Sequence, residues 1–163
     1  MIKHRNVKAL QEFHSYLKGI FGYSKMAITL KYSKKQTKYK EPIVSIKIKD
    51  RYGKLIDFDA LIDSGADTSV IPKYLAKALG VEESEAEEMT KVLGGKMRFR
   101  RTTIDIAIDD TQDKQTLKIP AIVLQDDTFD VPFLLGRKGF FDNFHITFRQ
   151  NEEEIQLSKV IQQ

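Results

Sequence analysis

The sequence predicts a mainly β protein, a compact closed barrel with little helix that is preceded by an N-terminal helical extension. Two observations lead to this prediction. After residue 42 the chain contains several short stretches in which apolar and polar residues alternate, with turn-forming residues between them, a pattern typical of all-β domains. The first 40 residues differ, because they are rich in Lys and contain one stretch with apolar residues at helical spacing.

Composition narrows the class of protein. The chain has 163 residues, of which 41% are hydrophobic and 31% charged, as in an ordinary globular domain. It has no cysteine, which excludes disulfides, thiolate metal sites and cysteine nucleophiles. The basic opening lacks the apolar segment of a secretory signal, and no apolar run approaches the roughly 18 residues of a membrane span. We therefore expect a cytoplasmic protein that does not bind a membrane.

Positive charge is concentrated in residues 1–40, which hold ten Lys and Arg side chains and one acidic side chain, Glu12. We therefore expect a basic extension (1–40) and a mildly acidic body (41–163). Residues 7–21 predict an amphipathic helix, and the Lys-rich residues 31–42 are interpreted as a linker. A basic arm is either a solvated segment or a surface for nucleic acid or an acidic partner, and no nucleic-acid-binding motif supports the latter.

The body is expected to begin with a β-hairpin. Apolar and polar residues alternate over residues 44–48 and 56–62, with Tyr52-Gly53 between the two stretches. The second strand leads directly into Asp63. Residues 72–79 then predict a short helix with proline at its start and glycine just past its end.

The glutamate-rich residues 82–88 are expected to be a solvated loop or helix face. Three further β stretches are expected at residues 89–108, 116–124 and 144–157, the last with a break near Asn151. In the first of them the apolar residues change from odd to even positions, which predicts a bulge or a change of packing partner near Arg101. Pro120 predicts an edge or bulged position in the next strand.

The sharpest local feature is the segment Ala60-Leu61-Ile62-Asp63-Ser64-Gly65-Ala66-Asp67, in which an apolar strand delivers a carboxylate into a turn. An Asp-Ser-Gly turn is common and carries no function by itself. This one is followed by the apolar pair Val70-Ile71, so its carboxylate lies between two apolar stretches, which a solvated turn does not need.

The segment resembles the active-site loop of retropepsin-like aspartic proteases, which reads apolar-apolar-Asp-Ser/Thr-Gly-Ala-Asp. Phe133-Leu134-Leu135-Gly136-Arg137 is similar to the apolar-apolar-Gly-Arg segment before the C-terminal helix of that family. Val92-Leu93-Gly94-Gly95-Lys96-Met97 falls where the family has its glycine-rich flap hairpin. The resemblance covers roughly residues 41–160 and implies a single-lobe retropepsin-like acid protease barrel with one short C-terminal helix.

The resemblance also implies an aspartic endopeptidase that acts on polypeptides without a metal or organic cofactor. Such enzymes use two carboxylates about 3 Å apart that share a proton. One is the general base for a water molecule, and the other donates a hydrogen bond to the scissile carbonyl. One chain offers one such aspartate, so a two-fold homodimer is expected to supply the second.

Carried onto this chain, the resemblance makes Asp63 the catalytic residue, with Ser64 and Gly65 as supporting residues of its loop. The residues expected to contact substrate are Gly65, Ala66, Asp67, Gly94 and Gly95. Asp67 and Arg137 are expected to form a structural ion pair. The chain departs from the family in its flap, which has fewer glycines than retroviral flaps, and in its N-terminal extension, which the minimal viral enzymes lack.

These departures leave a second hypothesis, a catalytically inactive retropepsin-fold dimer that binds peptides or nucleic acid without cutting them. Other candidate sites are weaker. The three histidines are widely spaced without a ligand pattern, and the acidic pairs Asp109-Asp110 and Asp126-Asp127 are interpreted as solvated turns. We therefore predict no metal site.

Overall fold

The computed structural model describes residues 27–33, 40–92, 95–110, 113–126 and 131–160. The helix expected at residues 7–21 lies outside them. Described strands are β1 (Ala27–Lys31), β2 (Ile43–Lys49), β3 (Leu55–Ile62), β4 (Ser69–Ile71), β5 (Glu87–Val92), β6 (Gly95–Asp109), β7 (Lys114–Leu124), β8 (Leu134–Leu135), β9 (Phe144–Arg149) and β10 (Glu154–Lys159). Described helices are α2 (Lys73–Leu79), α3 (Arg137–Phe140) and the 3-10 turn η1 (Phe141–Asn143).

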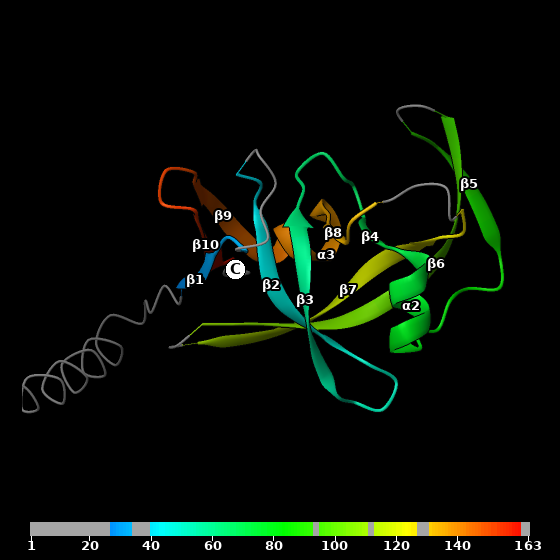
Figure 1. Cartoon of the computed structure of the whole chain (residues 1–163), viewed down its shortest axis with the longest axis horizontal. Helices are drawn as coiled ribbons and strands as arrows, with labels where there is room; N and C mark the ends of the chain where they lie inside the picture. Colours follow the sequence, from blue (N-terminus) through cyan, green and yellow to red (C-terminus); the bar gives the residue numbers. More distant parts are fainter. Residues whose placement is uncertain (1–26, 34–39, 93–94, 111–112, 127–130, 161–163) are drawn as a thin grey trace, which may run out of the picture.

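The expected closed barrel is confirmed. Seven strands pair in the order β2-β3-β8-β4-β7-β6-β5, and an additional pairing of β2 with β6 closes the sheet on itself. The closing contact is short, since it pairs Lys47 with Ala107 and Ile48 with Ile106. The Lys47 ammonium reinforces the closure by donating to both carboxylate oxygens of Asp109, at 2.7 and 2.8 Å. Figure 1 shows β2, β3, β6 and β7 crossing at the centre of the molecule.

A second sheet of three antiparallel strands, β1-β10-β9, lies beside the barrel (Figure 1). Its strand β1 falls inside the expected extension (1–40) and pairs with β10 from Ala27 to Lys31. Tyr32, expected in a linker, is buried and forms a bridge with Val44 of the barrel. The apolar residues Ile28, Leu30 and Tyr32 alternate with exposed or half-buried ones, and burying that face outweighs the Lys-rich composition of the region.

One core joins the two sheets, and most of the buried apolar residues of the described chain belong to it. Strand β6 contributes to this core through Ile104, Ile106 and Ile108 but packs Met97 and Phe99 in a separate cluster. Its pairing with β7 is continuous from Phe99 to Asp109. The odd-to-even shift in the sequence is therefore a change of packing partner and not a bulge.

The turns follow the sequence in most places. Strands β2 and β3 form the expected hairpin, with Gly53 at a φ of +82°. Helix α2 follows Pro72 and ends at Gly80 in the left-handed conformation. Glu87 and Glu88, expected in a solvated loop or helix face, instead begin β5. Pro120 is exposed and pairs only with β6, because the pairing of β7 with β4 begins at Ala121.

The expected short C-terminal helix is present as two helical turns, α3 and η1. They are not one continuous helix, because Lys138 and Gly139 within α3 have non-helical backbone angles. No helix in the described part of the chain is long and apolar enough to cross a membrane.

Candidate active site

The loop that carries Asp63 is anchored by an unusual arrangement of three strands. Strand β3 enters the loop, β4 leaves it, and β8 lies between them in the sheet. β8 pairs in parallel with β3, at Leu61 with Leu134 and Ile62 with Leu135, and antiparallel with β4, at Val70 with Leu134. Because both ends of the loop share one neighbour, the position of Asp63 is set by a segment more than 70 residues further along the chain.

Backbone hydrogen bonds continue this anchoring through the loop itself. The Asp63 N–H donates to the Leu135 carbonyl at 3.0 Å. In the other direction, the N–H groups of Arg137 and Lys138 donate to the carbonyls of Ala66 and Asp67, at 2.8 and 2.9 Å. Residues 135–138 therefore hold the beginning and the end of the Asp63 loop in register.

The Asp63 side chain is half-buried, and Ser64 and Gly65 next to it are exposed. Its Oδ1 atom accepts a hydrogen bond from the Gly65 N–H at 2.8 Å, and its backbone carbonyl accepts one from the Ala66 N–H at 3.3 Å. The first bond fixes the orientation of the carboxylate relative to the loop. The loop thus presents a partly solvated carboxylate on a rigid strand end.

Gly136 makes the closest approach between the two segments. A Cβ atom placed on it would lie 2.5 Å from the Thr68 carbonyl carbon and 2.9 Å from the Ala66 carbonyl oxygen. Its N–H donates to the Ser69 hydroxyl oxygen at 3.1 Å, and Ser69 is fully buried. Ser69 was not predicted to be a structural residue. Its place immediately before the apolar pair Val70-Ile71 was a local signal that its hydroxyl needs an internal partner.

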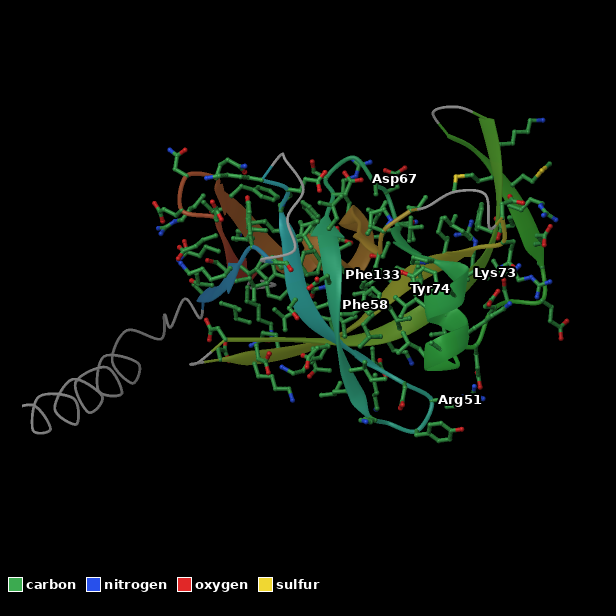
Figure 2. All side chains as sticks on the ribbon, viewed as in Figure 1. Arg51, Phe58, Asp67, Lys73, Tyr74 and Phe133 are labelled. Atoms are coloured by element: carbon green, nitrogen blue, oxygen red, sulfur yellow. The ribbon has the colours of Figure 1, made fainter. Side chains whose placement is uncertain are left out.

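Asp67 and Arg137 form the expected ion pair, between the Asp67 Oδ1 atom and the Arg137 Nη2 atom. Both side chains are largely exposed, at 79% for Asp67 and 57% for Arg137. Figure 2 places Asp67 at the end of the molecule where the β3–β4 loop lies, with Phe58 and Phe133 below it. These two rings pack edge to face at 6.3 Å, and buried Phe133 extends the apolar support under the loop.

Strands β5 and β6 form the hairpin expected as a flap. Figure 1 shows it projecting from the body beyond α2. Gly95 begins β6 with a φ of +152° and open space where a side chain would stand, so its backbone is accessible to a ligand. Gly94 lies outside the described residues.

The other candidate acids that the structure describes have structural partners. Asp109 pairs with Lys47, and Asp126, expected in a solvated turn, pairs with Arg98 on β6. His145 is exposed. Among the described residues, no group of three or more His, Asp or Glu side chains is arranged to hold a metal ion.

Comparison with known proteins identifies the family to which the sequence belongs. The sequence model of the family described as "gag-polyprotein putative aspartyl protease" matches residues 53–140, a segment that contains both the Asp63 loop and the β8 segment that anchors it. The chain belongs to this aspartyl protease family. The comparison with curated proteins gave no match.

Solved structures of aspartic proteases resemble this family member in fold. A retropepsin-like aspartic protease from Rickettsia conorii superposes with a TM-score of 0.52 at 16% identity, over 82% of this chain and 90% of its own. The EIAV protease in complex with the inhibitor HBY-793 gives a TM-score of 0.44 at 20% identity, over 65% of this chain and 86% of its own. The superposition with the Rickettsia conorii protein shows that the barrel described above has a retropepsin-like fold.

Proposed function

We propose that this aspartyl protease family member is an endopeptidase that hydrolyses peptide bonds through a water molecule activated by two Asp63 residues, one from each chain of a homodimer. The observation that carries the proposal is the anchoring of the Asp63 loop. The half-buried carboxylate lies at a strand end whose loop is held by backbone hydrogen bonds with residues 135–138, which is the preorganisation that catalytic groups require.

The proposed chemistry needs the two Asp63 carboxylates to share one proton, since two charges about 3 Å apart do not both persist. The ionised Asp63 takes a proton from water as the oxygen attacks the scissile carbonyl carbon. The protonated Asp63 hydrogen-bonds the carbonyl oxygen and stabilises the tetrahedral intermediate. A proton is then transferred to the leaving nitrogen as the carbon–nitrogen bond breaks. The Gly65 N–H, which binds Oδ1, keeps each carboxylate oriented during these transfers.

The substrate is proposed to be an extended polypeptide that lies across the exposed face of the loop. Gly65, Ala66 and Asp67 are exposed or half-buried there. The Gly65 carbonyl is proposed to pair with the peptide backbone in strand-like fashion. The β5–β6 hairpin is proposed to cover the peptide, with Gly95 contacting its backbone. A cytoplasmic location is also proposed, because the chain has no cysteine for the disulfides that small secreted domains use.

The proposal is tested by incubating the protein with an unfolded protein substrate between mildly acidic and neutral pH. We expect fragments from the parent protein and none from Asp63→Asn. Asp57→Asn is the matched control, because Asp57 lies on β3, the strand that leads into Asp63, but is exposed, with a long 3.8 Å contact to Lys47. It should cleave like the parent. Cleavage that survives Asp63→Asn would remove Asp63 from the mechanism.

A further inference from the structure

The β5–β6 hairpin is attached to the body in an asymmetric way. Strand β5 is the last strand of the barrel sheet and pairs with β6, whereas β6 continues into the barrel and pairs with β7. The pairing between β6 and β7 reaches Phe99, opposite Leu124. Residues 95–98 therefore lie beyond the last β6–β7 pair, and the direction of the hairpin depends on what holds β6 near this point.

Asp126 and Arg98 form the contact on one face of β6. The Arg98 backbone N–H donates to Asp126 Oδ2 at 2.9 Å, and its guanidinium donates to Asp126 Oδ1 from Nε at 3.0 Å and from Nη2 at 2.7 Å. The Gln125 N–H returns a hydrogen bond to the Arg98 carbonyl at 2.9 Å. The residues just after β7 thus grip both the backbone and the side chain of Arg98.

Arg98 also reaches the other strand of the hairpin, and the Asp126 segment reaches α2. The Arg98 Nη1 atom lies 3.3 Å from Glu87 Oε1 on β5. Lys73, at the start of α2, donates from Nζ to the Gln125 carbonyl at 3.0 Å (Figure 2 labels Lys73 on this helix). Arg98 therefore links both strands of the hairpin to the segment after β7, and Lys73 ties that segment to α2.

The opposite face of β6 at this level is apolar. Met97 and Phe99 are buried and form a cluster with Leu124, and Val70, Ile122 and Val131 pack against it. Val70 belongs to β4, which leaves the Asp63 loop. Side chains alternate across a strand. Arg98 therefore holds one face of β6 where the hairpin leaves the barrel, and Met97 and Phe99 hold the other face. The apolar cluster alone would let β6 slide, because hydrophobic contacts have little directionality. The three hydrogen bonds to Asp126 are directional and oppose this sliding.

We propose that Arg98 and Asp126 are positioning residues that fix the direction in which the β5–β6 hairpin leaves the barrel, and so the position of the proposed flap relative to the Asp63 loop. The consequence for catalysis rests on the proposed endopeptidase function. The positioning role itself does not, because it concerns the hairpin of the free protein.

The chain offers a matched control in a second ion pair on the same hairpin. Arg101 on β6 donates to both carboxylate oxygens of Glu88 on β5, at 2.7 and 2.9 Å. This pair has similar chemistry, but its side chains join the two hairpin strands to each other and not to the residues after β7. Removing its charge should leave the direction of the hairpin unchanged.

The positioning role is tested by measuring a distance between the hairpin and the body. Because the chain has no cysteine, spin labels can be placed at Met89→Cys on β5 and Tyr74→Cys on α2, both highly exposed positions at 66% and 63%. Labelled chain is diluted with unlabelled chain so that distances arise within one copy. We expect Asp126→Asn to broaden or shift the distance distribution, Asp126→Glu to restore it in part, and Glu88→Gln to leave it as in the parent. A distribution that Asp126→Asn leaves unchanged, or that Glu88→Gln alters equally, would overturn the proposal.

Cleavage kinetics provide a second test in unlabelled protein. An exposed ion pair of this kind biases an equilibrium by about two- to five-fold, so Asp126→Asn should raise KM by that factor with a smaller change in kcat. Salt should raise the KM of the parent toward that of the variant, because it screens the pair, and should affect Glu88→Gln as it affects the parent. A KM that Asp126→Asn leaves unchanged counts against the positioning role. If the parent cleaves nothing, the endopeptidase proposal fails, and the distance measurement still decides the positioning role.

Discussion

Replacing Gly136 by alanine tests how the Asp63 loop is supported. The backbone of Gly136 has a φ of −90° and a ψ of 179°, a conformation that any residue adopts. The effect of Gly136→Ala is therefore steric and does not come from backbone strain. The added methyl group would lie 2.5 Å from the Thr68 carbonyl carbon, 2.7 Å from the Thr68 oxygen and 2.9 Å from the Ala66 oxygen. All three are backbone atoms of the loop or of its exit toward β4.

The size of the effect follows from these distances. Carbon atoms in favourable contact lie about 3.5–4.0 Å apart, so the two segments must separate by about 1 Å. Overpacking of this kind costs about 1–3 kcal/mol. In a chain of this length each kcal/mol lowers the unfolding midpoint by about 2–4 °C, which predicts a decrease of about 2–12 °C. The separation would also stretch the hydrogen bonds from Arg137 and Lys138 to the loop, so cleavage should fall.

Thermal unfolding of parent and variant at one protein concentration measures the decrease, since dimerisation makes the midpoint depend on concentration. Gly65→Ala is the control, because its methyl group would meet only the flexible Asp63 side chain, with Oδ1 at 3.1 Å. We expect it to cost less than about 0.5 kcal/mol, as an exposed substitution does. A Gly136→Ala protein that unfolds at the parent midpoint would refute the close approach of the two segments.

Three further predictions concern single side chains. Ser69→Ala leaves the Gly136 N–H buried without its 3.1 Å partner, so urea unfolding should show a loss of about 1–3 kcal/mol; an unchanged free energy of unfolding would contradict this. Asp67→Asn breaks an exposed ion pair and should change the free energy of unfolding by less than about 1 kcal/mol. If Asp67 binds substrate, cleavage by this variant should fall about tenfold. Cleavage equal to that of the parent would leave Asp67 only a structural role. The hydrogen bond to Asp109 raises the pKa of Lys47, so its stabilisation is complete below the ordinary lysine pKa of about 10.4 and is lost as pH rises through the folded-state value. Above about pH 10 the stability of the parent should therefore fall more steeply than that of Lys47→Met, and parallel pH profiles would contradict this.

Much of the barrel could be predicted from local patterns. The alternation over residues 44–48 and 56–62 and the turn at Gly53 determine the β2–β3 hairpin, because side-chain period and turn geometry are local properties. Pro72 and Gly80 similarly bound α2. The strands that were missed, β4 and β8, have three and two residues, too few to show a period. They exist because they pair with β3 and β7, which are distant in sequence. β1 had a visible alternation at Ile28 and Leu30 that the surrounding lysines obscured.

In the candidate site too, local features could be predicted from the sequence, and the partners of distant residues could not. The motif and its apolar flanks singled out Asp63, whose catalytic role stays a prediction. The family resemblance implied the pairing of Asp67 with Arg137, and the structure contains that ion pair. The partners of Ser69 and Asp126 were not found, because Gly136 and Arg98 come beside them only when the barrel closes. Composition at Asp126-Asp127 suggested a solvated turn, and no sequence pattern marks which of two adjacent acids will meet a distant arginine.

The dependence of cleavage on the mixture of parent and Asp63→Asn chains tests the central claim most directly. If the active site needs one Asp63 from each of two exchanging chains, activity should follow the square of the parent fraction. An equal mixture at constant total concentration should then retain about a quarter of the parent activity, because about a quarter of two-fold dimers contain two parent chains. An activity proportional to the parent fraction, about half in the equal mixture, would show that one chain suffices and would contradict a dyad shared across the dimer.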